Sequence, residues 1–297
     1  MNKLAKRLRQ ILSKEKNIRT ELFSSLYIRP FFRAGLSIFF KKKTPEKWIF
    51  LVGCYNSGTT ILRDILGEHG EISCLPKEGV RYTNIFKRPD DIGWVRNWVY
   101  CKDYIRLPSE TEDKAKSRII KDWSPFWDSK KSFFLEKSIS NIERMEWIDK
   151  NFDNVYFLGI LRSGYAVSEG IKRKAKPKAP AIDEYGSSEY SYTTTAEQWV
   201  MANTNMLEYA EKVSNFKLLR YEQFAEKPVE LLDEICTFLG LENSFEIAGN
   251  EVTIGQKKVK IQNMNHKSLA RLNSSQRQEI NAVAKPLLTR LNYEIYD

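Results

Sequence analysis

Hydrophobic residues along the chain fall into short unbroken runs that alternate with stretches of helical spacing. Four runs have the character of buried strands in a parallel sheet: Trp48–Val52, Phe133–Leu135, Val155–Leu161 and Phe216–Leu219. In the intervening stretches apolar residues recur every three or four positions, as in residues 61–66, 142–148 and 196–213. This alternation of strands and helices predicts an α/β domain with a mostly parallel sheet.

Two residue pairs predict where helices begin. Thr195 with Gln198, and Ser275 with Gln278, have the three-residue spacing of capping boxes, in which the two side chains bind each other's backbone N–H groups. Ahead of the first of these helices, residues 172–180 (KRKAKPKAP) combine Lys, Arg and Pro. We expect them to form a flexible basic loop that does not separate two domains.

The composition is that of an ordinary globular protein, with 42% hydrophobic and 29% charged residues among 297. The formal net charge of +10 is unevenly placed, because residues 1–43 hold 12 basic and 2 acidic residues and the remainder holds 36 of each. A balanced body does not predict a nucleic-acid-binding domain. The four cysteines form no CxxC pair and there are two histidines, so we expect neither a disulfide framework nor a zinc site, and a cytoplasmic location.

The N-terminal residues 1–44 form a basic amphipathic segment ahead of a single domain at 45–297. Its first 28 residues place apolar positions at roughly helical spacing, namely Leu4, Leu8, Ile11, Leu12 and Ile18. Arg29 and Arg33 interrupt the apolar patch that follows, so no run reaches the roughly 20 residues that span a bilayer. Two interpretations remain: a helix on an anionic membrane surface, at its inner face, or an appendage that packs partly on the body.

A phosphate-binding loop is predicted directly after the first strand. Gly53–Thr60 (GCYNSGTT) has glycines at both ends of a four-residue spacer, between a strand and a helix. This arrangement turns backbone N–H groups toward an anion at the positive end of the helix. The loop of nucleotide-hydrolysing enzymes carries Lys where this chain has Thr59, which argues against ATP or GTP chemistry. A tight turn without a ligand is the alternative.

The stretch GCYNSGTTIL resembles the 5′-phosphosulfate loop of sulfotransferases that use 3′-phosphoadenosine 5′-phosphosulfate (PAPS). Later segments agree with the family in order and spacing, over about residues 46–245: Leu75–Gly79, Glu136–Ser138, Phe157–Ser168, Leu219–Phe224 and Phe238–Leu241. Leu75–Gly79 resembles the segment with a catalytic glutamate in the bacterial and tyrosylprotein-type branches. The resemblance implies a three-layer α/β/α fold with a P-loop-like loop, PAPS as donor without a metal, and a hydroxyl-bearing carbohydrate or small metabolite as acceptor.

The resemblance also implies the residues that bind the donor: Tyr55, Asn56, Ser57, Gly58, Thr59 and Thr60 in the loop, with Arg162, Ser168 and Tyr221 elsewhere. Chemistry supports a second site, because a nucleotide phosphorylated at both ends of its ribose needs two anion sites. Arg162 follows the strand Val155–Leu161 and can grip a 3′-phosphate through two N–H groups. The family usually places a serine eight residues after this arginine, where this chain has Gly170.

The catalytic residues implied are Glu78, Lys137 and Asn56. Sulfuryl transfer is an in-line displacement that depends on positioning, charge stabilisation and one proton acceptor. Glu78 is the predicted base, and His69 is a weaker choice because its place at a helix end favours capping. The family often carries a cation at position 56, whereas an amide supplies no charge, so the leaving-group charge must fall on Lys137, Arg162 or backbone amides. Lys137 is the first choice.

Two further interpretations of the same loop remain open: a PAPS-binding protein without catalysis, suggested by Asn56 and Gly170, and a P-loop kinase, which Thr59 disfavours. Two tryptophan pairs, Trp94 with Trp98 and Trp123 with Trp127, predict either helical stripes in the core or rings that cover an acceptor. The basic run 172–178 predicts either a solvated loop or a contact with an acceptor or nucleotide. Lys257, Lys258 and Lys260 are assigned to the 3′-phosphate only loosely.

Overall fold

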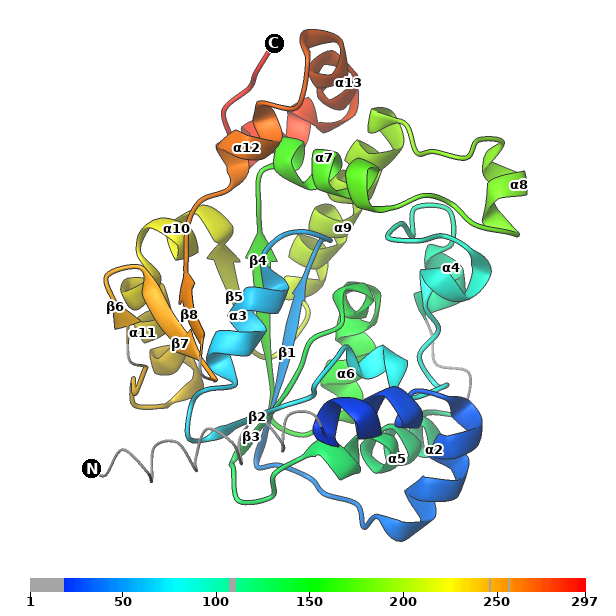
Figure 1. Cartoon of the computed structure of the whole chain (residues 1–297), viewed down its shortest axis with the longest axis vertical. Coiled ribbons are helices and arrows are strands. Elements are labelled where there is room, and N and C mark those ends of the chain that lie inside the picture. The colour runs from blue at the N-terminus through cyan, green and yellow to red at the C-terminus, as the bar shows by residue number, and fades with distance from the viewer. Residues whose placement is uncertain (1–18, 107–110, 246, 256) are drawn as a thin grey trace.

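A central sheet of five parallel strands organises the computed structural model, which describes residues 19–106, 111–245, 247–255 and 257–297. Figure 1 shows the strands, which stand in the order β2-β3-β1-β4-β5. They are β1 (Lys47–Gly53), β2 (Ile72–Cys74), β3 (Phe133–Glu136), β4 (Val155–Leu161) and β5 (Phe216–Arg220). Because β1 pairs with both β3 and β4, its Phe50 lies opposite Glu136 on one side and Phe157 on the other. The predicted strands and their parallel arrangement are confirmed.

Helices cover both faces of this sheet. Successive side chains of a strand point to opposite faces, so Trp48, Phe50 and Val52 belong to one core cluster, and Ile49 and Leu51 belong to the other. The first cluster is covered by α5 (Glu112–Trp123), α6 (Met145–Asn151), α7 (Gly164–Lys174), α9 (Tyr192–Ala210) and α13 (Ser274–Arg290). The second is covered by α3 (Thr59–Leu66), α10 (Tyr221–Glu226) and α11 (Pro228–Leu239). The three-layer α/β/α fold is therefore confirmed.

A small antiparallel sheet packs beside α3 and was not predicted. Its strands are β6 (Ile247–Ala248), β7 (Glu251–Ile254) and β8 (Lys257–Lys260). Val252 of β7 and Ile261 join the same core cluster as α3. The short elements that complete the description are α2 (Pro30–Leu36), α4 (Lys102–Arg106), α8 (Ala181–Tyr185), α12 (Asn265–Leu269), η1 (Ser37–Phe39), η2 (Gly79–Arg81), η3 (Pro89–Ile92), η4 (Ser124–Phe126) and η5 (Ile139–Arg144).

Both predicted helix starts are wrong. The cap of α9 is Ser191, whose side chain accepts a hydrogen bond from the Thr194 backbone N–H at 3.0 Å. The cap of α13 is Asn273, which forms a capping box with Gln276. Thr195 and Ser275 therefore lie inside the helices that they were expected to cap, because other polar residues just upstream satisfy the first N–H groups.

All four paired tryptophans are buried in the same core cluster, which agrees with the core interpretation. The helical stripes are wrong, however, because Trp94 and Trp98 lie in the irregular segment before α4, and α5 ends at Trp123. Trp123 and Trp127 instead contact Trp48, with ring centroids 6.1 Å away in both cases. Their role is to fill the core under β1.

The described part of the N-terminal segment packs on the body. Residues 19–27 are helical, and Phe23 and Tyr27 contact the ring of Phe126 at centroid distances of 5.5 and 5.4 Å. The Ser24 hydroxyl lies 2.6 Å from the Tyr82 hydroxyl. The predicted helix over residues 1–18 lies outside the described residues.

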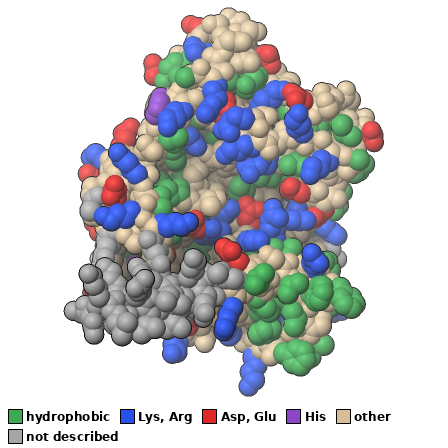
Figure 2. Space-filling view, viewed as in Figure 1, with side chains coloured by type: hydrophobic (Ala, Val, Ile, Leu, Met, Phe, Trp, Pro, Cys, Tyr) green, Lys and Arg blue, Asp and Glu red, His purple; other side chains and the backbone are tan. Residues whose placement is uncertain are grey.

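The outer face of this segment is apolar. Its exposed side chains are Leu22, Leu26, Phe31, Phe32, Ile38 and Phe39, and we call this set the apolar face. Figure 2 shows hydrophobic side chains gathered over this part of the molecule. Among the described residues, no helix has both the length and the apolar character that crossing a membrane requires.

Candidate active site

A cavity of about 650 Å³ lies at the carboxyl ends of the parallel strands. Each of the five strands is followed by a residue that lines it. Tyr55 follows β1, Glu78 follows β2, Lys137 follows β3, Arg162 follows β4 and Tyr221 follows β5. Parallel strands bring their carboxyl ends to one edge of a sheet, which is where open α/β sheets place their ligands. The sheet thus gathers five predicted residues that are far apart in the sequence.

The loop between β1 and α3 forms one wall of the cavity. Asn56, Gly58, Thr59 and Thr60 line it together with Tyr55. Gly58, with φ of 94°, directly precedes α3 as its N-cap, and a Cβ atom there would lie 2.7 Å from the Tyr221 ring. Glycine is therefore required both for the backbone conformation and for the close approach of Tyr221. The first N–H groups of α3 have no partner inside the helix and are available to an anion.

Arg162 contacts the same loop. Its Nη1 donates to the Asn56 carbonyl at 2.6 Å and its Nε donates to Asn265 Oδ1 at 2.8 Å. Its guanidinium carbon lies 4.0 Å from the centroid of the Tyr221 ring. Burial lowers the pKa of Arg162, and no carboxylate within the described residues forms an ion pair with it. The cation is therefore held by neutral groups.

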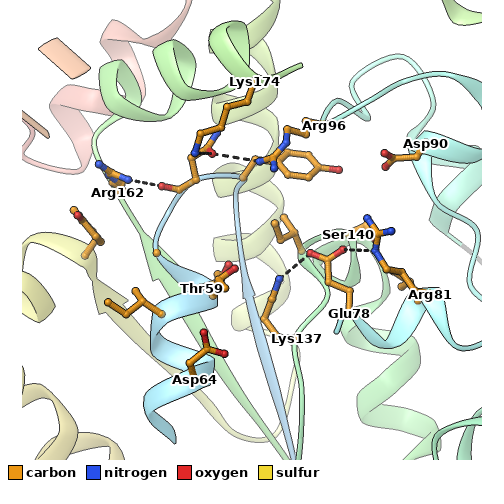
Figure 3. Close-up of a pocket in the computed structure, with 18 of the residues that line it drawn as sticks. Thr59, Asp64, Glu78, Arg81, Asp90, Arg96, Lys137, Ser140, Arg162 and Lys174 are labelled. Atoms are coloured by element: carbon orange, nitrogen blue, oxygen red, sulfur yellow. Dashed lines mark hydrogen bonds and ion pairs between the residues drawn. The ribbon is translucent and has the colours of Figure 1, made fainter. Parts of the chain in front are cut away.

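Two further cations meet the Asn56 side chain, and neither was predicted as a site residue (Figure 3). Asn56 Oδ1 accepts hydrogen bonds from Arg96 Nη1 at 3.3 Å and from Lys174 Nζ at 3.1 Å. Arg96 belongs to no motif, whereas Lys174 belongs to the basic run at 172–178. Burial lowers the pKa of Lys174, and the neighbouring charges of Arg96, Arg173 and Arg162 lower it further. Contact with an acceptor or nucleotide is one of the two interpretations of the run 172–178. Within the described residues, Lys174 is the residue of this run that lines the cavity.

Glu78 and Lys137 form an ion pair on the opposite wall, with 2.8 Å between Lys137 Nζ and Glu78 Oε1 (Figure 3). The Lys137 side chain is 5% exposed and that of Glu78 is 26% exposed. Arg81 Nε lies 3.9 Å from the other oxygen, Oε2. The buried Lys137 thus holds one oxygen of the carboxylate, while the other oxygen faces the exposed guanidinium of Arg81 at the longer distance.

The backbone at Gly79, directly after Glu78, is held by two buried side chains. The Gly79 N–H donates to Glu136 Oε1 at 2.7 Å, and the Gly79 carbonyl accepts from Trp123 Nε1 at 3.0 Å. A Cβ atom at Gly79 would lie 2.7 Å from Glu136 Oε1, so only glycine fits this close approach. Burial raises the pKa of Glu136 to about 7, against the opposing effect of its hydrogen bonds from Ser138 and Gly79.

Other predicted residues lie outside the cavity wall. The hydroxyls of Ser57 and Ser168 are buried without a hydrogen-bond partner in the described residues, and neither residue lines the cavity. His69, the weaker choice of base, does not line the cavity either. Its Nδ1 accepts from the Glu71 N–H at 3.1 Å and its Nε2 lies 2.9 Å from the Glu242 carbonyl, so both ring nitrogens serve the backbone.

The small sheet closes the cavity on the side of α3. Ile254, Lys257 and Val259 line it from β7 and β8. Of the loosely assigned lysines, Lys257 alone reaches the cavity within the described residues. In the basic run, Lys172 and Lys176 instead pair with Glu189 at 3.2 and 2.7 Å, outside the cavity.

Comparison with known proteins agrees with the fold described above. The model of a family described as "Sulfotransferase family" matches residues 48–246. The sulfotransferase of Alicyclobacillus acidocaldarius is 16% identical, with 84% of this chain and 97% of that chain covered and a TM-score of 0.51. The sulfotransferase domain of the Synechococcus PCC 7002 olefin synthase is 17% identical, with coverage of 86% and 99% and a TM-score of 0.52. At these identities the two structures show the shared fold. A search of curated proteins found no match.

Proposed function

The chain belongs to the sulfotransferase family of enzymes, and we propose that it transfers the sulfuryl group of PAPS to a hydroxyl of a carbohydrate or small-metabolite acceptor. The observation that carries this proposal is the composition of the cavity at the carboxyl edge of the sheet. An anion-binding loop and Arg162 form one wall, and the Glu78–Lys137 ion pair forms the wall opposite. A donor nucleotide and a proton acceptor can therefore face each other across one space.

The residues of the cavity fit the donor. A nucleotide with phosphate groups at both ends of its ribose requires cations and N–H donors at two places. Arg96, Arg162 and Lys174 form no ion pair with a carboxylate among the described residues, and the buried Asn56 Nδ2 donor has no partner there. The buried Arg162 and the buried Asn56 Nδ2 are costly without a partner of opposite charge or an acceptor, which supports an anionic ligand.

We assign the two ends of the donor as follows. Tyr55, Asn56, Gly58, Thr59 and Thr60, with the N-terminus of α3, bind the 5′ end. Arg162 binds the 3′-phosphate, for which its planar guanidinium is suited. Tyr221 stacks on Arg162 and packs against Gly58. Binding by the Ser57 and Ser168 hydroxyls stays a prediction.

The bound donor supplies an activated sulfuryl group, and this chain supplies the base and its orientation. Glu78 Oε2 takes the proton from the acceptor hydroxyl, while Lys137 holds Oε1 in the ion pair. Because an ammonium group has three N–H donors, Lys137 can keep this contact and also face the donor. General base catalysis of this kind contributes about 10²–10⁴-fold to a rate.

Donor binding is tested by thermal unfolding with added nucleotides. We expect adenosine 3′,5′-bisphosphate to raise the melting temperature more than AMP or ATP, because binding adds RT ln(1 + [L]/Kd) to stability. The variant Arg162→Ala should lose this preference, whereas Lys176→Ala, which removes a cation outside the cavity, should keep it. Equal stabilisation of the unmodified protein by AMP would contradict two anion sites.

Transfer itself is tested with radiolabelled PAPS and pools of hydroxyl-bearing carbohydrates and metabolites. We expect label to enter an acceptor in a reaction that requires Glu78. If bisphosphate binding is intact and no pool yields labelled product, the proposed transfer to these acceptors is wrong.

We also propose an anionic membrane surface as a partner of the N-terminal segment. The apolar face defined above lies on a segment whose first 43 residues carry 12 basic and 2 acidic residues. An apolar face beside many cations is the combination by which interfacial helices bind anionic lipid. In this proposal the positive charge of the segment favours anionic lipid, and the exposed Phe and Ile side chains are buried in the apolar part of the membrane surface.

A further inference from the structure

Asn56 brings together two cations from distant parts of the chain. Arg96 comes from the turns between η3 and α4, and Lys174 comes from the last turn of α7. Both donate to the same atom, Asn56 Oδ1, at 3.3 and 3.1 Å (Figure 3). Arg162 donates to the carbonyl oxygen of the same residue at 2.6 Å. Three positive charges thus surround one residue of the phosphate loop.

These charges are not neutralised by nearby carboxylates. Within the described ranges, neither Arg96 nor Lys174 forms an ion pair, and the additional contact of Arg96 is with the Tyr55 ring at 5.9 Å. Lys137 differs from them, because its charge is balanced by Glu78 at 2.8 Å. Compared with Lys137, the cations around Asn56 therefore carry positive charge that remains free for a ligand.

The Asn56 amide is held in place by the shape of α7. A Cβ atom at Gly170 would lie 3.0 Å from both Cγ and Nδ2 of Asn56, so glycine leaves the space that the amide fills. Asn56 itself adopts a φ of 60°, which asparagine tolerates better than most residues. Its Nδ2 is buried and has no partner in the part of the chain that is described. The amide is thus placed to hold two cations with its oxygen while its nitrogen remains free to donate.

We propose that Arg96 and Lys174, held by the Asn56 amide, supply the positive charge that stabilises the leaving nucleotide as the sulfuryl group departs. In this step the bond from sulfur to the acceptor oxygen forms and the bond from sulfur to the 5′-phosphate oxygen breaks. The electron pair of the broken bond stays on that phosphate oxygen, and the acceptor proton goes to Glu78. The inference rests on the proposed function and gives Asn56 a positioning role, because it acts through the two cations.

A role in stabilising the leaving group is separated from a role in binding the donor by comparing substitutions at Lys174, Arg96 and Lys176. Lys174→Ala and Arg96→Ala remove the proposed charges, Lys174→Arg keeps the charge, and Lys176→Ala removes a nearby lysine that pairs with Glu189 outside the cavity. For each variant, kcat and the KM for PAPS are measured with one accepted acceptor. Calorimetric titration gives the affinities for PAPS and for its product, adenosine 3′,5′-bisphosphate, without any acceptor.

Charge stabilisation should act on the leaving group more than on the bound donor. We expect Lys174→Ala and Arg96→Ala to lower kcat by about 10²-fold while the KM for PAPS changes by less than about threefold. Affinity for the bisphosphate, whose 5′-phosphate carries the charge that develops, should fall more than affinity for PAPS. Lys174→Arg should recover most of kcat, and Lys176→Ala should match the unmodified protein.

Two results would overturn the inference while leaving the proposed function in place. One is an unchanged kcat in both alanine variants of an enzyme that turns over, and the other is an equal loss of affinity for PAPS and bisphosphate with kcat preserved. If the unmodified protein binds neither nucleotide, the proposed function and this inference fail together.

Discussion

At the scale of single residues, Glu78 depends on neighbours that do not reach the cavity. Gly79 is bound on its N–H side by Glu136 and on its carbonyl side by Trp123. Lys137 then sets the direction of the Glu78 carboxylate. The proposed base is therefore positioned by a buried polar network as well as by its own contacts.

Glu78→Gln keeps the shape of the side chain and removes the proton acceptor. We expect kcat to fall by about 10²–10⁴-fold, the usual scale for a general base, with bisphosphate affinity nearly unchanged. Steady-state kinetics and calorimetry check the two parts, and Glu189→Gln, outside the cavity, is the matched control. Full turnover by Glu78→Gln would place the base elsewhere.

The buried Glu136 makes the free energy of unfolding depend on pH. Its pKa is about 7 in the folded chain, against an ordinary value of 4.5, because burial disfavours the charged form. Between these two pKa values the folded state therefore keeps a proton that the unfolded state releases. The stability that Glu136 contributes through this proton is fully present below pH 4.5 and is lost as pH rises through about 7.

Glu136→Gln should remove this dependence, because an amide does not titrate. We expect the melting temperature of the variant, relative to the unmodified protein, to rise between about pH 4.5 and pH 7 and to level off above that range. Thermal unfolding across this range is the measurement, with the exposed Glu189→Gln as control. A difference that stays constant with pH would show that Glu136 titrates normally.

At the scale of elements, β1, β3 and β4 were predictable because each is a continuous apolar run buried on both faces. The strands β6 to β8 were not, since they are short and β8 is the sequence Lys257-Lys258-Val259-Lys260, in which charge hides the pattern. The helix caps were misplaced because several polar residues near each start can accept the same N–H bonds. The spacing of these polar residues in the sequence does not show which of them caps the helix, whereas the folded structure does.

The cap of α13 offers a direct test. Asn273→Ala should lower the free energy of unfolding by about 1 kcal/mol, the usual cost of losing a cap. Ser275→Ala should change it by less than about 0.5 kcal/mol, because Ser275 is exposed inside the first turn. Urea unfolding of both variants measures the difference. The reverse order of effects would return the cap to Ser275.

The candidate site was predictable to the extent that it follows strand ends and local motifs. Arg162 and Lys137 come directly after strands, so the sequence placed them at the correct edge of the sheet. Arg96 and Lys174 reach Asn56 through the fold alone, across sequence separations of 40 and 118 residues. Contacts over such separations leave no local pattern, and one sequence without a structure does not reveal them.

At the scale of the whole molecule, the N-terminal segment joins the body through the same stretch that carries Glu78, the proposed base. Ser24 contacts Tyr82, and Arg33 contacts Asn84, a few residues after Glu78. Removing the segment would therefore uncover core side chains and disturb the cavity wall. The proposed membrane role is better tested by substitutions on the exposed face of the segment.

Phe31→Ser with Phe39→Ser should weaken binding to anionic vesicles in the full-length protein, because both rings are more than 80% exposed, at 86% and 82%. We expect binding of the unmodified protein to fall as salt rises, since surface charges are screened within about 8 Å at physiological ionic strength. Sedimentation with anionic and neutral vesicles measures both effects, and Leu218→Ser on β5 is the exposed apolar control. Sedimentation of the double variant identical to that of the unmodified protein would show that the apolar face does not bind the vesicles.

The cations around Asn56 also affect folding before any nucleotide binds. Like charges held close together repel one another, so the empty protein is less stable than a chain that lacks one of them. Lys174→Ala should therefore melt at a slightly higher temperature than the unmodified protein at low salt, and added salt should remove this gain by screening. Calorimetric melting at two salt concentrations measures it, and a lower melting temperature at low salt would contradict the repulsion. This protein would then show a trade-off between stability and activity, in which the charges proposed to serve the reaction weaken the fold of the empty protein.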